Sequence, residues 1–280
     1  MATTFSSFAV VGAGGIGHVV VDELLKKSLK VTILTRDDSK AELQAFKTRG
    51  ATIAAVDYSD LESLKAALTG VEAVVCAVGP AAHTVQLDVA RAAKAVGVQL
   101  FVPTEYGPNV RGGLHDHKKA VQDLLKEIDL PSALFFTGLF YEYAGYTLRI
   151  NPVEGSAAIV GDGKTKLSLI KRDEAGQFVA HTVSTASKDD LKWATIPFEG
   201  NRMTPLEIVE IAEKKLGKKI DITFIDYEET KKNFATDGWA FLNTMFADGR
   251  GVAGTEEEVA AAKAKYFPEW NPTTYEAFNQ

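Results

Sequence analysis

The sequence has almost no cysteine and no long hydrophobic run. Its 280 residues contain one cysteine, Cys76, which excludes an internal disulfide and is typical of a reducing compartment. Because Cys76 lies within the apolar residues 74–78, we expect a buried, unreactive thiol rather than a nucleophile. No apolar stretch reaches the roughly 18 residues that a membrane span requires, and no basic segment followed by an apolar one opens the sequence. We therefore expect a cytoplasmic protein with no membrane partner.

Basic residues are too few to suggest binding to nucleic acid. The chain has 31 Lys and Arg against 37 Asp and Glu, a formal net charge of −6, so nucleic acid is not expected as a partner. With 46% hydrophobic and 24% charged residues, the composition is that of an ordinary globular protein, and the length suits a large α/β domain with a smaller lobe. We expect a small-molecule substrate and a monomer or homodimer.

The few histidines do not favour a metal site. His115 and His117 are two residues apart, which places them on different sides of a helix, and no cysteine or third histidine is near them in the sequence. We therefore expect no metal. The sequence also lacks the GxSxG motif of serine hydrolases and the P-loop of nucleoside triphosphatases.

The most informative stretch that is present is FAVVGAGGIGH, residues 8–18. An apolar strand, a GxGxxG turn and a segment with helical spacing follow one another, in the order of a dinucleotide-binding βαβ unit. Gly12 permits the tight turn, Gly14 lets the backbone approach a pyrophosphate, and Gly17 lets the helix pack close to the strand. The positive end of the helix then faces the phosphates. The residues expected to bind the cofactor here are Gly12, Gly14, Gly15, Ile16 and Gly17.

Strands and helices alternate through the first half of the chain. This alternation predicts an α/β protein of the Rossmann type, with a doubly wound parallel sheet. The expected strands after the first are residues 30–35, 51–56, 72–78, 98–102 and 133–136.

The second half predicts a smaller α+β lobe. Residues 157–160 and 165–169, joined by a Gly-Asp-Gly turn, are typical of a hairpin. Thr204 starts a well-formed capping box, and Thr255 caps an alanine-rich helix. We expect an NAD(P)-binding domain in residues 1–150 and a substrate-binding lobe in residues 151–280, with some segments returning to the sheet.

Open α/β sheets bind ligands outside the carboxyl ends of their strands. Each expected strand of the first half ends in a residue that can contact a cofactor there. Besides the glycine turn and Arg36, these candidates are Asp57, Val78, Gly79, Thr104 and Glu105.

Arg36 distinguishes between the two nicotinamide cofactors. An NAD-binding site usually has an acid after the second strand, whereas Arg36 stands there and can hold a 2′-phosphate with its guanidinium. Lys40 can add a second positive charge. Asp37 and Asp38 can fold back to a ribose, and a solvated turn is the alternative interpretation. We favour NADP(H).

Lys118 begins the apolar stripe of a helix expected over residues 115–128. It shares this stripe with Val121, Leu125 and Ile128, whereas Lys119, Gln122, Asp123 and Lys126 are expected on the solvent side. Burial and the positive helix end would lower the pKa of such a lysine, as suits a general acid or base. The alternative is a lysine whose stem packs while its amine reaches water.

Aromatic residues gather after the expected strands 98–102 and 133–136. Several of them fall beyond the strand ends, where they can wall a flat apolar pocket above a nicotinamide, although they can equally belong to the core. The candidates for a substrate pocket are Tyr106, Phe140, Tyr141 and Tyr143.

Seven stretches match a known protein family. Through them the chain resembles the NmrA-like and isoflavone reductase-like group of atypical short-chain dehydrogenases/reductases, up to about residue 216. They are VVGAGGIG at 10–17, LTR at 34–36, QLFVPTEYG at 99–107, HDHKKAVQDLLKEIDLP at 115–131, GDGKTK at 161–166, RDEAGQFVA at 172–180 and NRMTPLEIVEIA at 201–212.

The resemblance implies a Rossmann domain that binds NADP(H) and a smaller lobe that shapes the substrate pocket. Reductases of this group transfer hydride from NADPH to small, often aromatic compounds. Lys118 matches their proton-handling lysine, and Arg36 matches the arginine that holds the 2′-phosphate. The chain departs from the group's usual GxTGxxG loop, and Thr104 and Tyr106 replace the more usual Ser and Phe. The group also contains NmrA-like redox sensors that bind NADP(H) or NAD(H) without turnover, and this alternative stays open.

Overall fold

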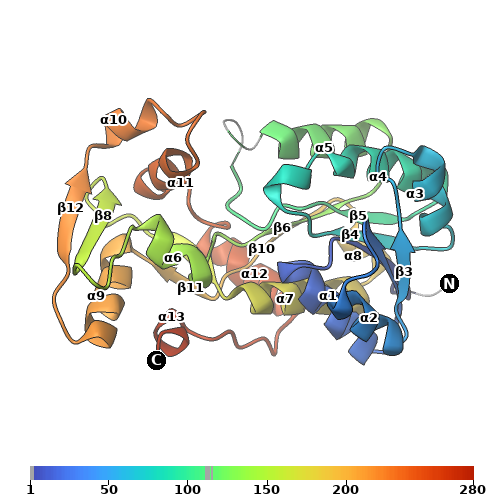
Figure 1. Cartoon of the computed structure of the whole chain (residues 1–280), viewed down its shortest axis with the longest axis horizontal. Coiled ribbons are helices and arrows are strands. Elements are labelled where there is room, and N and C mark those ends of the chain that lie inside the picture. Colours follow the sequence, from blue (N-terminus) through green and yellow to red (C-terminus); the bar gives the residue numbers. More distant parts are fainter. Residues whose placement is uncertain (1–2, 111–113, 115) are drawn as a thin grey trace.

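A five-stranded parallel sheet forms the centre of the larger part of the protein, at the right of Figure 1. The computed structural model describes residues 3–110, 114 and 116–280. The strand order, β3-β2-β1-β4-β5, is that of a Rossmann fold, as predicted. The strands are β1 (Ser7–Val11), β2 (Lys30–Thr35), β3 (Thr52–Ala55), β4 (Ala73–Cys76) and β5 (Leu100–Val102).

Two further strands extend this sheet beyond β5. The amide of Phe101 donates to the Pro131 carbonyl oxygen at 2.8 Å, and a parallel bridge joins Phe101 to Ser132, just before β6 (Ala133–Phe136). The strand β10 (Ala194–Pro197) pairs in parallel with β6. A segment from the second half of the chain therefore returns to the sheet, while a substrate-binding role for residues 151–280 stays a prediction.

Helices cover both faces of the sheet (Figure 1). Because both faces are covered, the residues of β1 and β4 are almost entirely buried, as is usual in parallel sheets. One apolar cluster joins the sheet to α1 (Gly15–Lys26), α2 (Ala41–Thr48), α7 (Arg172–Thr185) and α12 (Glu256–Tyr266). The other joins it to α3 (Leu61–Leu68), α4 (Val85–Ala95) and α5 (Asp116–Glu127).

The helix α1 begins three residues earlier than the helical spacing predicts. Gly15 and Gly17 carry no apolar side chain that would reveal the helix in the sequence, yet both are helical.

Two other helices begin as predicted, because both predicted caps form. Thr204 and Glu207 make the capping box of α9 (Pro205–Leu216), and Thr255 caps α12 in the same way.

The predicted hairpin in the second half is wrong. The strand β8 (Ser156–Val160) pairs with β12 (Asp221–Ile225), while β9 (Leu167–Ile170) pairs with β11 (Asn201–Met203) and β7 (Leu139–Phe140). The intervening turn is local, but both strands find their partners far away in the sequence. Pairing between distant segments cannot be seen in a local pattern of glycines and apolar residues.

The outer lobe, at the left of Figure 1, contains β8, β12 and α9 together with shorter helices. Among the described residues, no helix is long and apolar enough to cross a membrane. The remaining helices are η1 (Pro80–Ala82), α6 (Tyr141–Thr147), α8 (Lys188–Leu191), α10 (Tyr227–Lys231), α11 (Gly238–Ala247) and α13 (Tyr275–Phe278).

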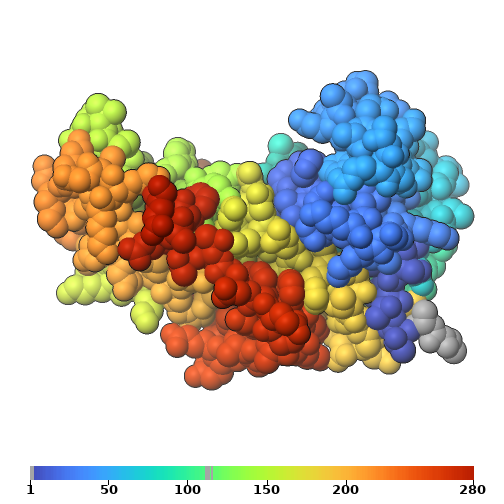
Figure 2. Space-filling model, turned by 90° about the horizontal axis from the view of Figure 1, so that it is seen from below, coloured from blue at the N-terminus to red at the C-terminus, as the bar shows by residue number. Residues whose placement is uncertain are grey.

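The C-terminal segment joins the two parts of the protein. Figure 2 shows it in red across the middle of the molecule, beside the yellow region that contains α7. The Thr273 amide donates to the Glu174 carboxylate of α7 at 3.0 Å, and the Tyr266 hydroxyl donates to the Asp190 carbonyl oxygen at 3.0 Å. These contacts hold the last residues against the body of the fold.

The helices α1 and α7 approach each other closely at Gly176. A Cβ atom added to Gly176 would lie 2.7 Å from Cβ of Val19 and 3.1 Å from the carbonyl oxygen of Ile16. A side chain at this position would therefore force the two helices apart.

We predict that Gly176→Ala lowers the free energy of unfolding by about 1–3 kcal/mol, because the added methyl group overpacks this contact. The matched control is Gly145→Ala in α6, where an added Cβ meets nothing within 4 Å. This control should leave stability unchanged or raise it, since alanine favours a helix. Thermal and urea unfolding measure both variants, and equal stabilities would contradict the packing account.

Candidate functional site

The glycine turn places the start of α1 against the end of β1. Gly12 has φ +89°, and a Cβ atom on it would lie 2.8 Å from the Ala77 carbonyl oxygen. A Cβ atom on Gly17 would lie only 1.8 Å from the Gly12 carbonyl oxygen. Gly14 precedes α1, and no side chain caps this helix. The amides of its first turn are therefore left for an anionic ligand.

A cleft of about 1930 Å³ lies along the carboxyl ends of the strands. Usual ligand pockets measure about 300–1,000 Å³, so this cleft has room for an extended dinucleotide and a substrate together. Gly17 is absent from its lining because it packs beneath the turn. The predicted cofactor contacts that line the cleft are Gly12, Gly14, Gly15, Ile16, Arg36, Lys40, Asp57, Val78, Gly79, Thr104 and Glu105.

Arg36 is an exposed residue that lines one end of the cleft. The neighbouring Asp37 is engaged in its own turn, where its carboxylate accepts hydrogen bonds from the Ser39 hydroxyl at 2.6 Å and the Ser39 amide at 2.9 Å. These bonds hold the pKa of Asp37 below its usual value. The arrangement favours Arg36 over Asp37 as the contact for a ribose 2′ substituent, and Lys40 lines the same end.

Hydrogen bonds fix the strand ends that form the floor of the cleft. The Val78 amide donates to Thr104 Oγ1 at 3.2 Å, and the Thr104 amide donates to Gln86 Oε1 at 2.8 Å. Tyr106 donates its hydroxyl to the Cys76 carbonyl oxygen at 3.0 Å, and burial raises the pKa of this phenol. Cys76 is fully buried, as predicted, and burial also raises the pKa of its thiol.

Lys118 lies in the first turn of α5 with its side chain 9% exposed. Its Nζ donates to the Glu105 carbonyl oxygen and lies 3.9 Å from Glu105 Oε2. Burial lowers the pKa of this amine, and the nearby Glu105 carboxylate opposes that shift. The amine is therefore fixed at Glu105 rather than reaching out to water, and Lys118 is part of the cleft lining.

The face of α5 differs from the prediction at one residue. Lys119 pairs with Asp123 on the solvent side, as expected. Gln122, which was predicted to face solvent, is buried and donates to Glu105 Oε1 at 2.6 Å. One turn separates Gln122 from Lys118, so both side chains reach Glu105.

A pair of hydrogen-bonded histidines, one of them in the cleft wall, was not predicted. His83, which lines the cleft, shares a hydrogen bond between its Nδ1 and His117 Nε2. Burial lowers the pKa of His83 to about 4, so its ring is neutral near pH 7. The two residues are 34 positions apart in the sequence, so no local motif marks them. His115, considered above as a metal ligand, lies outside the described residues.

Three of the four aromatic candidates for a substrate pocket line the cleft. Phe140 and Tyr143 line the cleft with ring centroids 6.1 Å apart, and Tyr106 lines its floor. The prediction is wrong for Tyr141, whose hydroxyl lies 2.9 Å from Asn201 Oδ1 and whose ring packs against Tyr275. Successive helical residues point about 100° apart, so Tyr141 and Tyr143 face different sides of α6.

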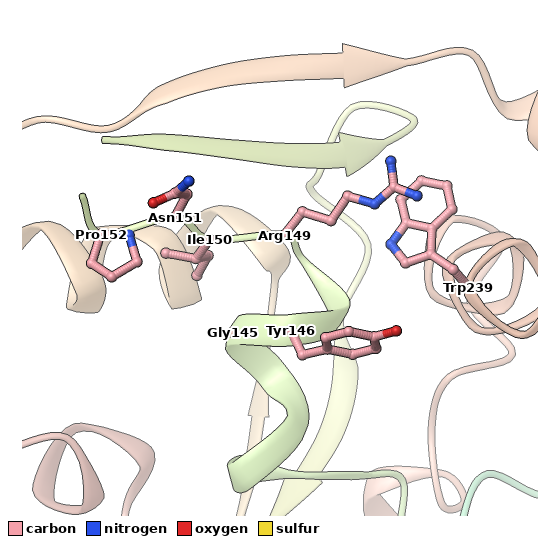
Figure 3. Close-up of a pocket in the computed structure, with 7 residues that line it drawn as sticks. All are labelled: Gly145, Tyr146, Arg149, Ile150, Asn151, Pro152 and Trp239. Carbon is pink, nitrogen blue, oxygen red and sulfur yellow. The ribbon is translucent and has the colours of Figure 1, made fainter. Parts of the chain in front are cut away.

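A second pocket of about 400 Å³ lies in the outer lobe (Figure 3). The Arg149 guanidinium stacks 3.9 Å from the ring centre of Trp239, whose Nε1 donates to the Thr147 carbonyl oxygen. This second pocket shares no lining residue with the larger cleft.

Within the described part of the chain, no group of three or more His, Cys, Asp or Glu residues is placed to hold a metal ion.

The strand order, the glycine turn and the long cleft define a Rossmann-type protein with a site suited to an adenine dinucleotide. The chain belongs to the NmrA-like family, whose model matches residues 5–279.

Three relatives illustrate what the chain is similar to. Phenylcoumaran benzylic ether reductase IRL1 of Ginkgo biloba is 28% identical over 82% of this chain and 81% of its own length. The structure of AtPrR2 with NADP+ and (+)pinoresinol has a TM-score of 0.82 at 20% identity, covering 100% of this chain and 99% of that one. The leucoanthocyanidin reductase–NADPH complex from Vitis vinifera has a TM-score of 0.82 at 22% identity, covering 97% of each chain.

Proposed function

We propose that this protein is an NADPH-dependent reductase of a small aromatic or conjugated carbonyl or alkene compound. The observation that carries the proposal is the buried amine of Lys118, which lies in the wall of the dinucleotide-sized cleft and is fixed there by Glu105. A cleft that only stored a nucleotide would not need a desolvated amine of this kind.

The chemistry of the cleft residues fits NADP(H). The amides at the start of α1 suit the diphosphate, and Arg36 with Lys40 suits the 2′-phosphate. The relatives named above support this assignment, since two of their structures contain NADP+ or NADPH. When bound, NADPH supplies the hydride for the reduction.

Lys118 would supply the proton that accompanies the hydride. Reduction of a carbonyl or a conjugated alkene adds one hydride and one proton, and the proton must reach the atom where negative charge develops. The Glu105 carbonyl oxygen orients Lys118 Nζ, and burial makes the protonated amine a stronger acid than an exposed lysine.

Phe140 and Tyr143 would select the substrate. Both side chains line the cleft and present flat rings, which favour a planar, conjugated or aromatic compound. The names of relatives, such as phenylcoumaran benzylic ether reductase and leucoanthocyanidin reductase, are consistent with reduction of small organic substrates.

A redox sensor without turnover is the alternative. Such a protein would use the glycine turn and Arg36 but would not need the buried amine of Lys118. No observation on the described residues favours this alternative, and two of the three relatives reported above are named as reductases.

We predict that Lys118→Met lowers kcat about 10²–10⁴-fold, because the proton donor is lost, while the Kd for NADPH stays near that of the parent. Lys119→Met is the matched control, since Lys119 faces solvent and pairs with Asp123. In the parent, the rate should fall as the pH rises through the pKa of Lys118, which lies below its usual 10.5. Stopped-flow oxidation of NADPH with a panel of enones, quinones and aldehydes measures these rates. Unchanged turnover in Lys118→Met would contradict the assignment.

Arg36→Gln should weaken NADPH binding about 10–100-fold, because a charge-assisted hydrogen bond to the 2′-phosphate is lost. The Kd for NADH should change little, since NADH lacks that phosphate. Arg49→Gln serves as control, because Arg49 pairs with Asp22 on the surface. Calorimetric titration of the parent and both variants gives the six constants, and equal losses for NADPH and NADH in Arg36→Gln would remove the role assigned to Arg36.

A further inference from the structure

Arg172 carries a buried polar atom that the fold leaves without a partner. It is the first residue of α7, and only Lys171 separates it from the end of β9. Its Nε is buried and has no hydrogen-bond partner among the described residues. An unpaired buried N–H costs free energy unless a ligand satisfies it. The side chain lines the large cleft, so a ligand can reach it there.

The Arg172 side chain lies beside the start of α1. A Cβ atom added to Gly15, the first residue of that helix, would lie 3.7 Å from Arg172 Cδ and 4.0 Å from its Nε. The N-terminus of this helix is where the diphosphate of a dinucleotide lies in a Rossmann fold. Arg172 therefore projects next to the expected position of the diphosphate.

No other cationic side chain occupies this part of the cleft lining. The glycine turn itself contains only glycine, alanine and isoleucine from residue 12 to residue 17. Arg36 and Lys40 follow β2, Lys118 is held by Glu105, and Arg91 pairs with Asp88 at 2.8 Å. Among the cationic residues of the cleft lining, Arg172 is thus the one that lies beside the glycine turn. No described carboxylate forms an ion pair with its side chain.

Two contacts fix Arg172 in this place. Its backbone amide donates to the Glu142 carboxylate, at 3.2 Å from Oε1 and 3.3 Å from Oε2. One turn further along α7, Gly176 packs directly on Val19 of α1. The same packing that joins the two helices therefore sets the position of Arg172 over the start of α1.

We propose that Arg172 binds the diphosphate of the cofactor, with Nε–H and the guanidinium donating hydrogen bonds to its oxygens. The inference rests on the proposed function and adds a ligand from the second half of the chain. Arg36 would bind the 2′-phosphate, which NADP(H) carries and NAD(H) lacks. Arg172 would bind the diphosphate, which both cofactors contain. Cofactor binding would thereby involve the second half of the chain, which also forms the outer lobe.

The test compares three ligands by calorimetric titration: NADPH, NADH and adenosine 2′-monophosphate, which has the 2′-phosphate but no diphosphate. Arg172→Gln should raise the Kd for NADPH and for NADH by about 10–100-fold, as expected for a lost charge-assisted hydrogen bond. Its Kd for adenosine 2′-monophosphate should match that of the parent. Arg36→Gln should show the opposite pattern, with adenosine 2′-monophosphate and NADPH weakened and NADH nearly unchanged.

Lys171→Gln is the matched control, because Lys171 precedes Arg172 in the sequence and is not part of the cleft lining. It should bind all three ligands as the parent does. A thermal melt of each variant separates lost binding from lost folding, and Arg172→Lys, which keeps the charge but lacks Nε–H, should regain part of the affinity. Parental affinity of Arg172→Gln for NADPH, or an equal loss for adenosine 2′-monophosphate, would overturn this inference alone. Failure of the parent to bind NADPH would overturn the proposed function with it.

Discussion

The helix α1 lies so close to the ends of β1 and β4 that no side chain fits between them. Gly17 packs directly on the Gly12 carbonyl oxygen, and Gly12 itself packs on Ala77 after β4. Because of this contact, the amides at the start of α1 open onto the edge of the sheet where the strands end. The position of the cleft, and of the phosphate contacts proposed in it, depends on that geometry.

The second half of the chain depends on the same helix. Gly176 brings α7 against α1, and the C-terminal segment is tied to α7 through Thr273 and Glu174. These contacts hold the segments that bring Phe140, Tyr143 and Arg172 to the cleft. The residues proposed to bind the cofactor and the substrate therefore belong to one packed body rather than to two independent units.

Local patterns in the sequence were sufficient for much of the fold. The GxGxxG turn, the capping box at Thr204 and the inward position of Lys118 each depend on residues within a few positions of one another, so their spacing could be interpreted correctly. Contacts between distant segments could not be seen in the same way. The pairing of β8 with β12 overrode a local hairpin signal, and the hydrogen bond of Gln122 to Glu105 buried a residue expected in solvent. For the same reason neither the His83–His117 pair nor the approach of Arg172 to Gly15 was predicted.

The cleft has two chemically different ends, with Arg36 and Lys40 after β2 and the buried amine of Lys118 at the start of α5. On this account the cofactor lies extended between them. A crystal structure of the protein with NADP+ tests this claim most directly. We expect the 2′-phosphate at Arg36, the diphosphate at the start of α1 and the nicotinamide ring on the side of Lys118. A nicotinamide ring placed outside this cleft, or a Lys118 amine turned away from it, would contradict the account.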